Sequence, residues 1–437
     1  MSARRRFLAC IGTLGAALGA GCRLEPARAQ PAHAPNRVDW QWVREQFGLA
    51  PDRIHMSALY IASHPRPVRD AIETYRRMLD ADPVLYLTDE NDERQRDVRE
   101  AAAGYLGVDA DDIALTDSTT MGVGLVYSGL ALARGQEILT TEHDYYVTHE
   151  AVRRAAERSG AALREIALYD GDASAAVSAE QIVERIAHAI TPATRVVALT
   201  WVSSNTGLKL PLARIASVLR DANRDRDEDA RILLAVDGVH GFGVEDVTLP
   251  ELGCDYFMAG CHKWLFGPRG TGIVWARRAA WAHVAPGIPS FSDAASWHAW
   301  LRDRPLQGPT TASRFTPGGF QAFEHQWALA EAFEFQRRLG KARVAERTHA
   351  LARRAKEGLA AMRHVRLHTP LSDALSSGIV TFDVRGMAPH AVVERLREKR
   401  IVATTTPYAD AHARIAPCIH NTEPEIDRLL AAVHAMG

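Results

Sequence analysis

The chain has 437 residues, of which 47% are hydrophobic, and its formal net charge is −1. This length is enough for a large core or two domains. A charge this close to zero, without a basic stripe, argues against a nucleic-acid-binding protein and predicts a mixed, soluble surface.

The first 29 residues predict a secretion signal. Arginines 4–6 precede Phe-Leu, a short apolar run follows, and the small-residue sequence "ARA" at 27–29 has the character of a cleavage site. The arginine group is similar to a twin-arginine (Tat) signal, which predicts a periplasmic or otherwise exported protein. Two alternatives stay open, an uncleaved anchor and a lipid anchor at Cys22.

The three cysteines beyond this segment do not form a disulfide framework, because the set is odd and sparse. The twin-arginine route carries folded proteins, so an exported protein that acquires a cofactor in the cytoplasm has a reason to use it.

Strands and helices alternate through the middle of the chain. Predicted strands cover 111–117, 137–143, 162–168, 194–202, 231–238 and 271–277, and predicted helices cover 118–133, 146–160, 178–190 and 211–224. Alternation with apolar strands is typical of a mostly parallel sheet that is covered on both faces. We therefore expect an α/β fold.

The pattern loosens after residue 277. Residues 285–320 are rich in Pro, Gly, Ser and aromatic residues and predict a long functional loop. A long helix is predicted over 321–362, and 363–437 has the pattern of a small α+β unit. The expected domains are the signal peptide (1–29), an N-terminal arm (30–55), a large domain (56–290), an active-site or interface loop (291–320) and a small C-terminal domain (321–437).

Polar side chains follow the ends of four of the predicted strands and of a fifth, "CDYFMAG" (254–260). Because ligands bind at the carboxyl ends of such strands, these residues are the candidate site. They are Ser118, Thr119, Thr120, His143, Ser203, Ser204, Asn205, Asp237, His240, His262 and Lys263.

These side chains supply what pyridoxal phosphate requires from a protein. A buried lysine amine forms a Schiff base with an aldehyde, and Lys263 stands in the constrained segment "AGCHKWLFGPRGTG". Asp237 can hold the pyridine nitrogen protonated, so that the ring is an electron sink. Residues 118–120 offer hydroxyls at a helix N-terminus for the phosphate, and His143 offers a flat ring.

The segments around these residues resemble class V of the fold-type I pyridoxal-phosphate enzymes. "AVDGVHGFG" and "GCHKWLFGPRGTG" are similar to the family's aspartate and lysine segments. "LTDSTTMGVGLVYSGL", "TTEHDYY", "TWVSSNTGLKLPL" and "ARIAPCIHNTEPEIDRLL" are similar to further segments, and together they cover roughly residues 50–435. "CHKW" and "TPGGFQAFE" favour the isopenicillin N epimerase-like branch over the cysteine desulfurase-like one.

The resemblance implies a role for each candidate residue. The fold implied is the fold-type I transferase fold, with a large domain around a seven-stranded sheet and a small α+β domain. Lys263 would form the Schiff base and carry a proton at the substrate Cα, Asp237 would pair with the pyridinium, and His143 would stack on the ring. The remaining roles are phosphate binding (Ser118, Thr119, Thr120, His262), contact with the ring hydroxyl (His240, Ser204, Asn205) and a bidentate carboxylate clamp (Arg414).

The sequence departs from the family pattern in two places. Many relatives carry a serine three residues before the lysine, where this chain has Gly260, so phosphate binding would depend more on Thr119, Thr120 and His262. Cysteine desulfurases carry a nucleophilic cysteine shortly before the arginine, and residues 401–413 contain none. This absence argues against persulfide chemistry of that kind.

We therefore expect an aminotransferase-like or epimerase-like enzyme that acts on an amino acid or related amine. The alternatives are a C–S lyase or other β-eliminating enzyme, a sugar aminotransferase and a catalytically silent pyridoxal-phosphate-binding protein. The resemblance also implies a homodimer. No metal site is expected, since His143 and His149 lack an "HExxH" pattern or paired cysteines.

Overall fold

The computed structural model describes residues 38–171 and 173–437. The predicted signal peptide lies outside these residues. Within the described part, no helix combines the length and the apolar character needed to cross a bilayer.

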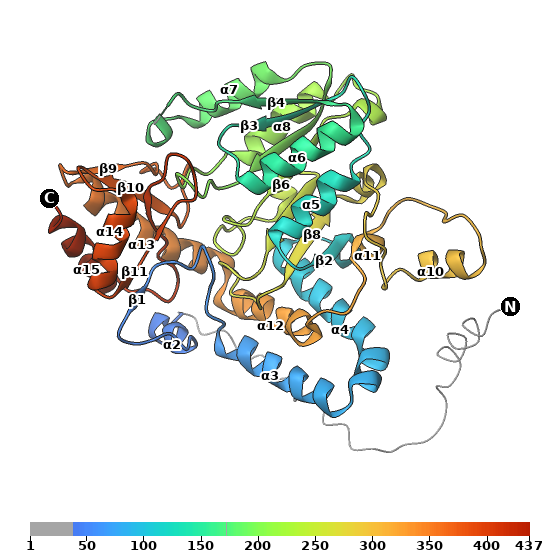
Figure 1. Cartoon of the computed structure of the whole chain (residues 1–437), viewed down its shortest axis with the longest axis horizontal. Helices are drawn as coiled ribbons and strands as arrows, with labels where there is room; N and C mark the ends of the chain where they lie inside the picture. Colours follow the sequence, from blue (N-terminus) through green and yellow to red (C-terminus); the bar gives the residue numbers. More distant parts are fainter. Residues whose placement is uncertain (1–37, 172) are drawn as a thin grey trace. The chain divides into compact units, whose positions relative to one another are not determined.

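A seven-stranded sheet forms the centre of the large domain (Figure 1). Its strand order is β2-β8-β7-β6-β5-β3-β4, in which β8 runs antiparallel to both neighbours and the other pairs are parallel. The α/β class expected from the sequence is thus confirmed. The strands are β2 (Ile113–Thr116), β3 (Glu137–Thr141), β4 (Ala162–Ile166), β5 (Thr194–Thr200), β6 (Leu233–Asp237), β7 (Tyr256–Gly260) and β8 (Gly272–Ala276).

Helices bury both faces of this sheet. Successive strand residues point to opposite faces, and on β5 Val196 belongs to one hydrophobic cluster while Val197 belongs to another. The cluster around Val196 includes residues of α5 (Thr119–Gly129) and α6 (Tyr146–Ser159). The cluster around Val197 includes residues of α7 (Ala179–Ala189) and α8 (Leu212–Ala222).

The segment before β2 forms three helices, α2 (Trp40–Glu45), α3 (Arg66–Ala81) and α4 (Pro83–Leu106). Helix α9 (Leu249–Leu252) lies between β6 and β7, and after the last strand of the sheet come α10 (Ala294–Leu301), α11 (Ala312–Phe315) and α12 (Phe323–Leu339). Helix α12 packs against α3 and α4 (Figure 1). This helix therefore belongs with the large domain rather than with the small domain that the sequence placed at 321–437.

The C-terminal part has its own sheet and core. A four-stranded sheet with the order β12-β13-β10-β9 packs with α13, α14 and α15 around Val380, Phe382 and Leu429. Strand β1 (Ile54–His55) pairs with β11, so the chain before α3 reaches this unit. The elements are α13 (Lys341–Ala360), β9 (Val365–Leu367), β10 (Val380–Val384), α14 (Pro389–Glu398), β11 (Ile401–Val402), β12 (Thr404–Thr405), β13 (Ala413–Ile415) and α15 (Glu423–His434).

Two predicted elements differ from the structure. The single helix expected over 321–362 is two helices, because Gly340 adopts φ +87° between α12 and α13, a conformation that ends a helix. The loop expected over 285–320 contains the short helices α10 and α11, whose caps are the side chains of Asp293 and Thr311.

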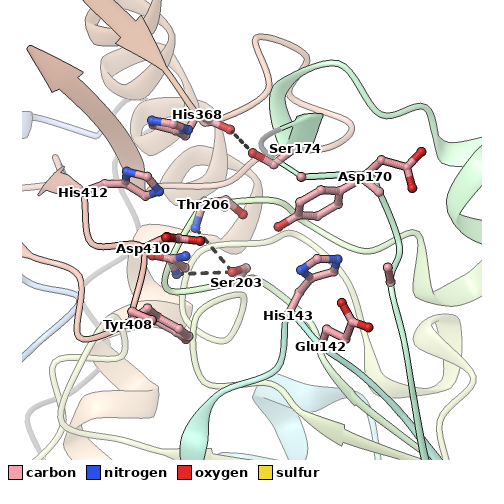
Figure 2. A pocket seen from close by; sticks show the side chains of 15 residues that line it. Glu142, His143, Asp170, Ser174, Ser203, Thr206, His368, Tyr408, Asp410 and His412 are labelled. Carbon is pink, nitrogen blue, oxygen red and sulfur yellow. Dashed lines mark hydrogen bonds between the residues drawn. The ribbon is translucent and has the colours of Figure 1, made fainter. Parts of the chain in front are cut away.

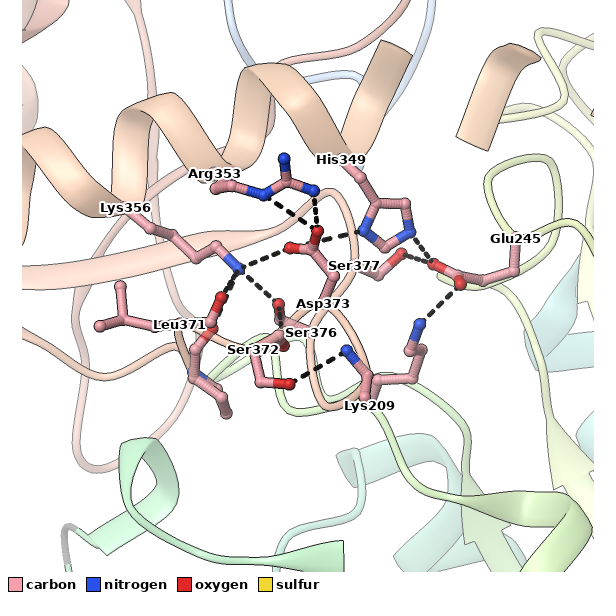
Figure 3. A network of polar contacts seen from close by, with 12 residues as sticks. Lys209, Glu245, His349, Arg353, Lys356, Leu371, Ser372, Asp373, Ser376 and Ser377 are labelled. Atoms are coloured by element: carbon pink, nitrogen blue, oxygen red, sulfur yellow. Dashed lines mark hydrogen bonds and ion pairs between the residues drawn. The ribbon is translucent and has the colours of Figure 1, made fainter. Parts of the chain in front are cut away.

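A buried polar network joins α13 to the large domain (Figure 3). Lys356 has a fully buried side chain, and its Nζ bonds Ser376 Oγ at 2.6 Å and Leu371 O at 2.9 Å. On the same helix, His349 Nε2 lies 3.0 Å from Glu245 Oε1. Glu245 also accepts from Lys209, so α13 is tied to the segments after β5 and β6 that carry the candidate site.

Candidate active site

A cavity of about 220 Å³ lies at the carboxyl ends of the central strands and contains Lys263. It gathers most of the residues that the sequence selected. Those lining it are Ser118, Thr119, Thr120, Ser204, Asp237, His240, His262, Lys263 and Arg414. The small domain contributes Arg414, so both domains form this cavity.

Lys263 follows β7, and its amine is held in a partly neutral state. Burial lowers the pKa of Lys263 to about 8, although Asp237 opposes this shift and Arg414 adds to it. Its Nζ lies 3.4 Å from Nε2 of His240. A pKa near 8 leaves about a tenth of the amine unprotonated at pH 7, and the unprotonated form is the nucleophile.

Asp237 is the last residue of β6 and is almost fully buried. Burial raises its pKa to about 6, and the backbone N–H of Val239, 3.1 Å from Oδ1, opposes the rise. A buried carboxylate is costly without a cationic partner. The side chain therefore suits a protonated ring nitrogen in the cavity.

The N-terminus of α5 lines the cavity beside β7. Ser118 caps this helix by accepting from the Met121 N–H at 3.1 Å, and the Gly260 N–H donates to Thr119 Oγ1 at 2.8 Å. His262 Nδ1 is buried with no hydrogen-bond partner within the described residues. Helix N-terminal N–H groups with hydroxyls and a free imidazole nitrogen are the donor set that a phosphate requires.

Gly260 lies three residues before Lys263 at a point of close contact. A Cβ at this position would lie 3.0 Å from both Thr119 Oγ1 and His262 Cε1. That distance is tighter than ordinary contact, so a side chain would displace the two groups that line the phosphate end of the cavity. The glycine keeps both of them in place.

Arg414, on β13, is buried, and two backbone oxygens and one threonine hydroxyl hold its guanidinium. Its Nη1 donates to Ser204 O at 2.7 Å, its Nε to Thr404 Oγ1 at 3.1 Å and its Nη2 to Thr405 O at 3.3 Å. Burial lowers the pKa of Arg414 to about 10, and the group remains cationic at neutral pH. No carboxylate of the described residues forms an ion pair with it, so its charge is available to a ligand carboxylate.

Three selected residues lie in a neighbouring cavity instead (Figure 2). His143 stacks on Tyr169, with ring centroids 3.8 Å apart, and its Nε2 accepts from the Leu168 N–H at 3.1 Å. Ser203 and Asn205 line the same second cavity. The structure therefore does not bring His143, Ser203 or Asn205 to the cavity of Lys263. The backbone after β3 turns the histidine toward the end of β4.

Sequence reasoning missed the tyrosines of the active cavity. Tyr60 and Tyr145 line it, and Tyr408 borders it through a 2.8 Å contact between its hydroxyl and Ser204 Oγ. Tyr145 is two residues after His143 in "TTEHDYY", but residues 142–144 form a turn, so that Tyr145 lines the cavity of Lys263 while His143 lines the neighbouring one. The sequence pattern carries no signal for this turn. No signal marks Tyr60 either.

The residues present fit pyridoxal phosphate. The cavity offers an amine of lowered pKa at Lys263, a buried carboxylate at Asp237 and an unpartnered His262 Nδ1 beside a helix N-terminus. These three match the aldehyde, the ring nitrogen and the phosphate of one cofactor.

The fold and this cavity together define a fold-type I pyridoxal-phosphate enzyme. Residues 62–429 match the family model "Aminotransferase class-V", and the chain belongs to that family. It is accordingly a pyridoxal-phosphate-dependent enzyme of the kind that acts on an amino acid or a related amine.

The chain matches curated relatives over almost the whole length of each relative. The chain is 30% identical to an isopenicillin N epimerase of Streptomyces clavuligerus and 29% identical to one of Amycolatopsis lactamdurans, in each case over 91% of this chain and 98% of the relative. It is 25% identical to a probable cysteine desulfurase of Xylella fastidiosa, over 92% of this chain and 96% of the relative.

Solved structures share the fold. A complex of the cystine C-S lyase C-DES with cysteine persulfide superposes with a TM-score of 0.77 at 23% identity, over 88% of this chain and 98% of that one. A cysteine desulfurase from Thermococcus onnurineus NA1 superposes with a TM-score of 0.78 at 21% identity, over 92% of this chain and 99% of that one.

Proposed function

We propose that this enzyme moves the Cα proton of an α-amino acid, with Lys263 as the base, and that its reaction is epimerase-like or aminotransferase-like. The observation that carries the proposal is the presence of Lys263, Asp237 and Arg414 in one cavity. An amine of lowered pKa, a partner for the ring nitrogen and a carboxylate clamp are the parts that such a proton transfer uses.

Each residue has a separate task. The guanidinium of Arg414 holds the substrate carboxylate and thereby fixes the direction of the Cα–H bond. Lys263 holds the cofactor through its Nζ and, when released, accepts the proton from Cα and returns it. Asp237 keeps a proton on the ring nitrogen. When bound, pyridoxal phosphate supplies an electron sink for the bond that breaks at Cα.

Return of the proton to the opposite face of Cα is the first outcome to test. Two isopenicillin N epimerases match the chain over 98% of their own length, and this supports the epimerase-like reaction. Transfer of the amino group to the cofactor is the second outcome, and loss of a β-substituent is the third.

Desulfuration of the cysteine desulfurase type has no nucleophile in the described residues. Cys254, Cys261 and Cys418 are all buried. Burial raises the pKa of Cys254 and of Cys418 to about 12, and it raises that of Cys261 as well. A thiol of raised pKa is not a thiolate at neutral pH, and the thiolate is the nucleophile.

The experiment begins with the absorption spectrum of the full chain before and after borohydride. A near-visible band that borohydride removes, with added mass on the peptide of Lys263, supports the anchor. A Lys263→Ala variant must lose both the attachment and the activity, while Lys399→Ala, an exposed lysine, must keep both. Turnover by Lys263→Ala at near the wild-type rate would refute the mechanism.

The reaction type follows from a panel of L- and D-amino acids in D₂O. Exchange of the Cα hydrogen with loss of optical rotation identifies epimerisation, and formation of a keto acid with a one-turnover change of the cofactor band identifies transamination. Ammonia with a keto acid in every turnover identifies elimination. A cofactor band that no amino acid changes identifies a catalytically silent binding protein.

We also propose that the chain is exported through the twin-arginine route. The sequence of residues 4–8 and the small-residue site at 27–29 support this. Replacing Arg4 and Arg5 by lysine must trap the protein in the cytoplasm. A Cys22→Ser variant that is released from the membrane fraction would instead indicate a lipid anchor.

A homodimer is the last part of the proposal. Large apolar side chains in and around the 291–320 segment are exposed, a pattern that favours a protein interface. They are Phe291 (73% exposed), Trp297 (47%), Trp300 (64%) and Phe320 (84%). Sedimentation velocity of the cofactor-loaded protein tests this, and a monomer at micromolar concentration would contradict it.

A further inference from the structure

Three side chains of the small domain converge at a point outside the active cavity. Nε2 of His368 lies 2.7 Å from Oδ2 of Asp383, and Nδ1 of His412 lies 3.0 Å from Oδ1 of the same carboxylate. The two imidazole rings stack, with centroids 3.7 Å apart. One ligand atom from each residue falls within 4.8 Å of the others.

The four-stranded sheet fixes this arrangement. Asp383 is on the central strand β10, which pairs with β9 on one side and β13 on the other. His368 follows β9, and its N–H donates to Thr381 O at 3.0 Å. His412 precedes Ala413, which pairs with Phe382. One ligand on a strand and two directly beside the ends of its neighbouring strands are held more rigidly than ligands within a long loop.

We propose that His368, Asp383 and His412 bind a divalent transition-metal ion, with Zn²⁺ as the best match. Two imidazole nitrogens and one carboxylate oxygen form a donor set that zinc uses, and three protein ligands leave a fourth position open to water or a ligand. The imidazoles are nearly buried, with 3% and 9% of their side chains exposed, whereas Asp383 is 35% exposed. An ion therefore has a route to the site.

Hydrogen bonds alone would also hold these three groups together. The hydrogen-bonded state and the metal-bound state differ in whether the imidazole nitrogens that face Asp383 carry protons. In the hydrogen-bonded state each imidazole donates a proton to Asp383, whereas in the metal-bound state both nitrogens present lone pairs at about 2.0–2.1 Å from the ion. The present separations are those of hydrogen bonds, so metal binding requires the carboxylate to rotate and the protons to move to the outer ring nitrogens or to water.

The metal site borders the second cavity. This cavity has a volume of about 500 Å³, and its lining includes His368 and His412 on one side and His143 on the other (Figure 2). His412 is two residues before Arg414, and alternate residues of a strand share a face. One strand face thus contributes Arg414 to the active cavity and His412 to its neighbour. An ion at this place would present its open position to the second cavity.

The test uses the full chain loaded with pyridoxal phosphate, so that Lys263 and the histidines of its cavity, His240 and His262, are occupied. After dialysis against a chelator, zinc is titrated by calorimetry and the bound metal is counted by atomic emission. We expect the wild-type protein to bind one equivalent more than a His412→Ala variant. We expect zinc affinity at this site to fall by more than about 100-fold in the variant, because loss of even an outer partner costs about 10- to 100-fold.

Two further variants keep the test decisive. Asp383→Asn preserves shape and hydrogen bonding but weakens the metal site. This variant must therefore bind one equivalent of zinc less than the wild type, as His412→Ala does. His390→Ala removes an exposed histidine of the same domain, and this variant must still bind the extra equivalent of zinc. Cobalt offers a second readout, since Co²⁺ at this site must give visible ligand-field bands that the His412 and Asp383 variants lack. Equal stoichiometry in the wild type and in all three variants would overturn the proposal and leave a hydrogen-bonded triad.

Discussion

The indole Nε1 of Trp264 lies 3.2 Å from Nδ1 of His240. An indole nitrogen only donates, so Nδ1 must be the acceptor. Burial, with Lys263 adding to it, holds the pKa of His240 well below its ordinary value. The ring is therefore neutral with its single proton on Nε2. That proton faces Lys263 Nζ at 3.4 Å and favours the unprotonated amine.

Replacing Trp264 by phenylalanine should raise the pKa of Lys263. Without the indole donor, the His240 proton can move to Nδ1, and Nε2 then accepts from the ammonium form of Lys263. The shift should be up to about one pKa unit, which is the value of one net hydrogen bond of about 1 kcal/mol. The measurement is the pH dependence of cofactor capture by the apoprotein, followed by the near-visible band.

In the wild type, capture should accelerate with pH and level off above about pH 8, where Lys263 is deprotonated. The Trp264→Phe midpoint should lie higher. Trp281→Phe is the matched control, because Trp281 is equally buried but its Nε1 has no partner in the described part of the chain. A common midpoint in all three proteins would show that the indole does not set the tautomer.

Asp237→Asn should stabilise the apoprotein while it destroys activity. The pKa of Asp237 is raised by burial from 3.8 to about 6. Because the folded pKa lies above the unfolded one, the folded apoprotein is favoured below about pH 4 and loses stability as the pH rises to about 6. The loss should approach about 3 kcal/mol, and an asparagine does not incur it.

Urea unfolding of both apoproteins at pH 4 and pH 8 measures this difference. We expect the variant to gain relative to the wild type only at pH 8, and its turnover to fall by more than about 100-fold because the ring nitrogen loses its charged partner. A variant that is less stable than the wild type at pH 8 would mean that the carboxylate has a stabilising partner in the apoprotein.

The central sheet was predictable because both its faces are buried. The strands are short apolar runs separated by helix-length segments, and their ends determine where Asp237 and Lys263 stand. The N-terminal helices α3 and α4 lack such a local alternation with strands. The break at Gly340 depends on one left-handed residue inside an otherwise helical pattern, so composition favoured a single helix there.

The placement of single side chains was harder to predict than the fold. Lys263, Asp237 and Arg414 come together because strand ends and the two domains place their backbones there. His143 does not join them, because the direction of its ring depends on the stack with Tyr169 and on the Leu168 N–H, both contributed by the segment after the neighbouring strand β4. The histidines 368 and 412 are 44 residues apart, and only the antiparallel register joins them.

Arg414→Lys should raise KM for α-amino acids by about 10- to 100-fold, with a smaller effect on kcat. Lysine keeps the charge but loses the planar, bidentate geometry that fits a carboxylate. Arg400→Lys is the control, since Arg400 is an exposed arginine paired with Asp52. Initial rates with an α-amino acid and with the corresponding amine lacking the carboxylate separate the effects. An Arg414→Ala variant with unchanged activity would favour a substrate without a carboxylate, such as an amino sugar.

Lys356→Met should lower the free energy of unfolding by about 3 kcal/mol without moving the cofactor band. The buried ammonium bonds Pro370 O at 3.1 Å, Leu371 O at 2.9 Å and Ser376 Oγ at 2.6 Å, and methionine leaves these oxygens buried without a donor. Lys399→Met, at an exposed position, should change stability by less than about 0.5 kcal/mol. Urea titration of the cofactor-loaded proteins measures both changes, and equal midpoints would mean that water replaces the ammonium in this network.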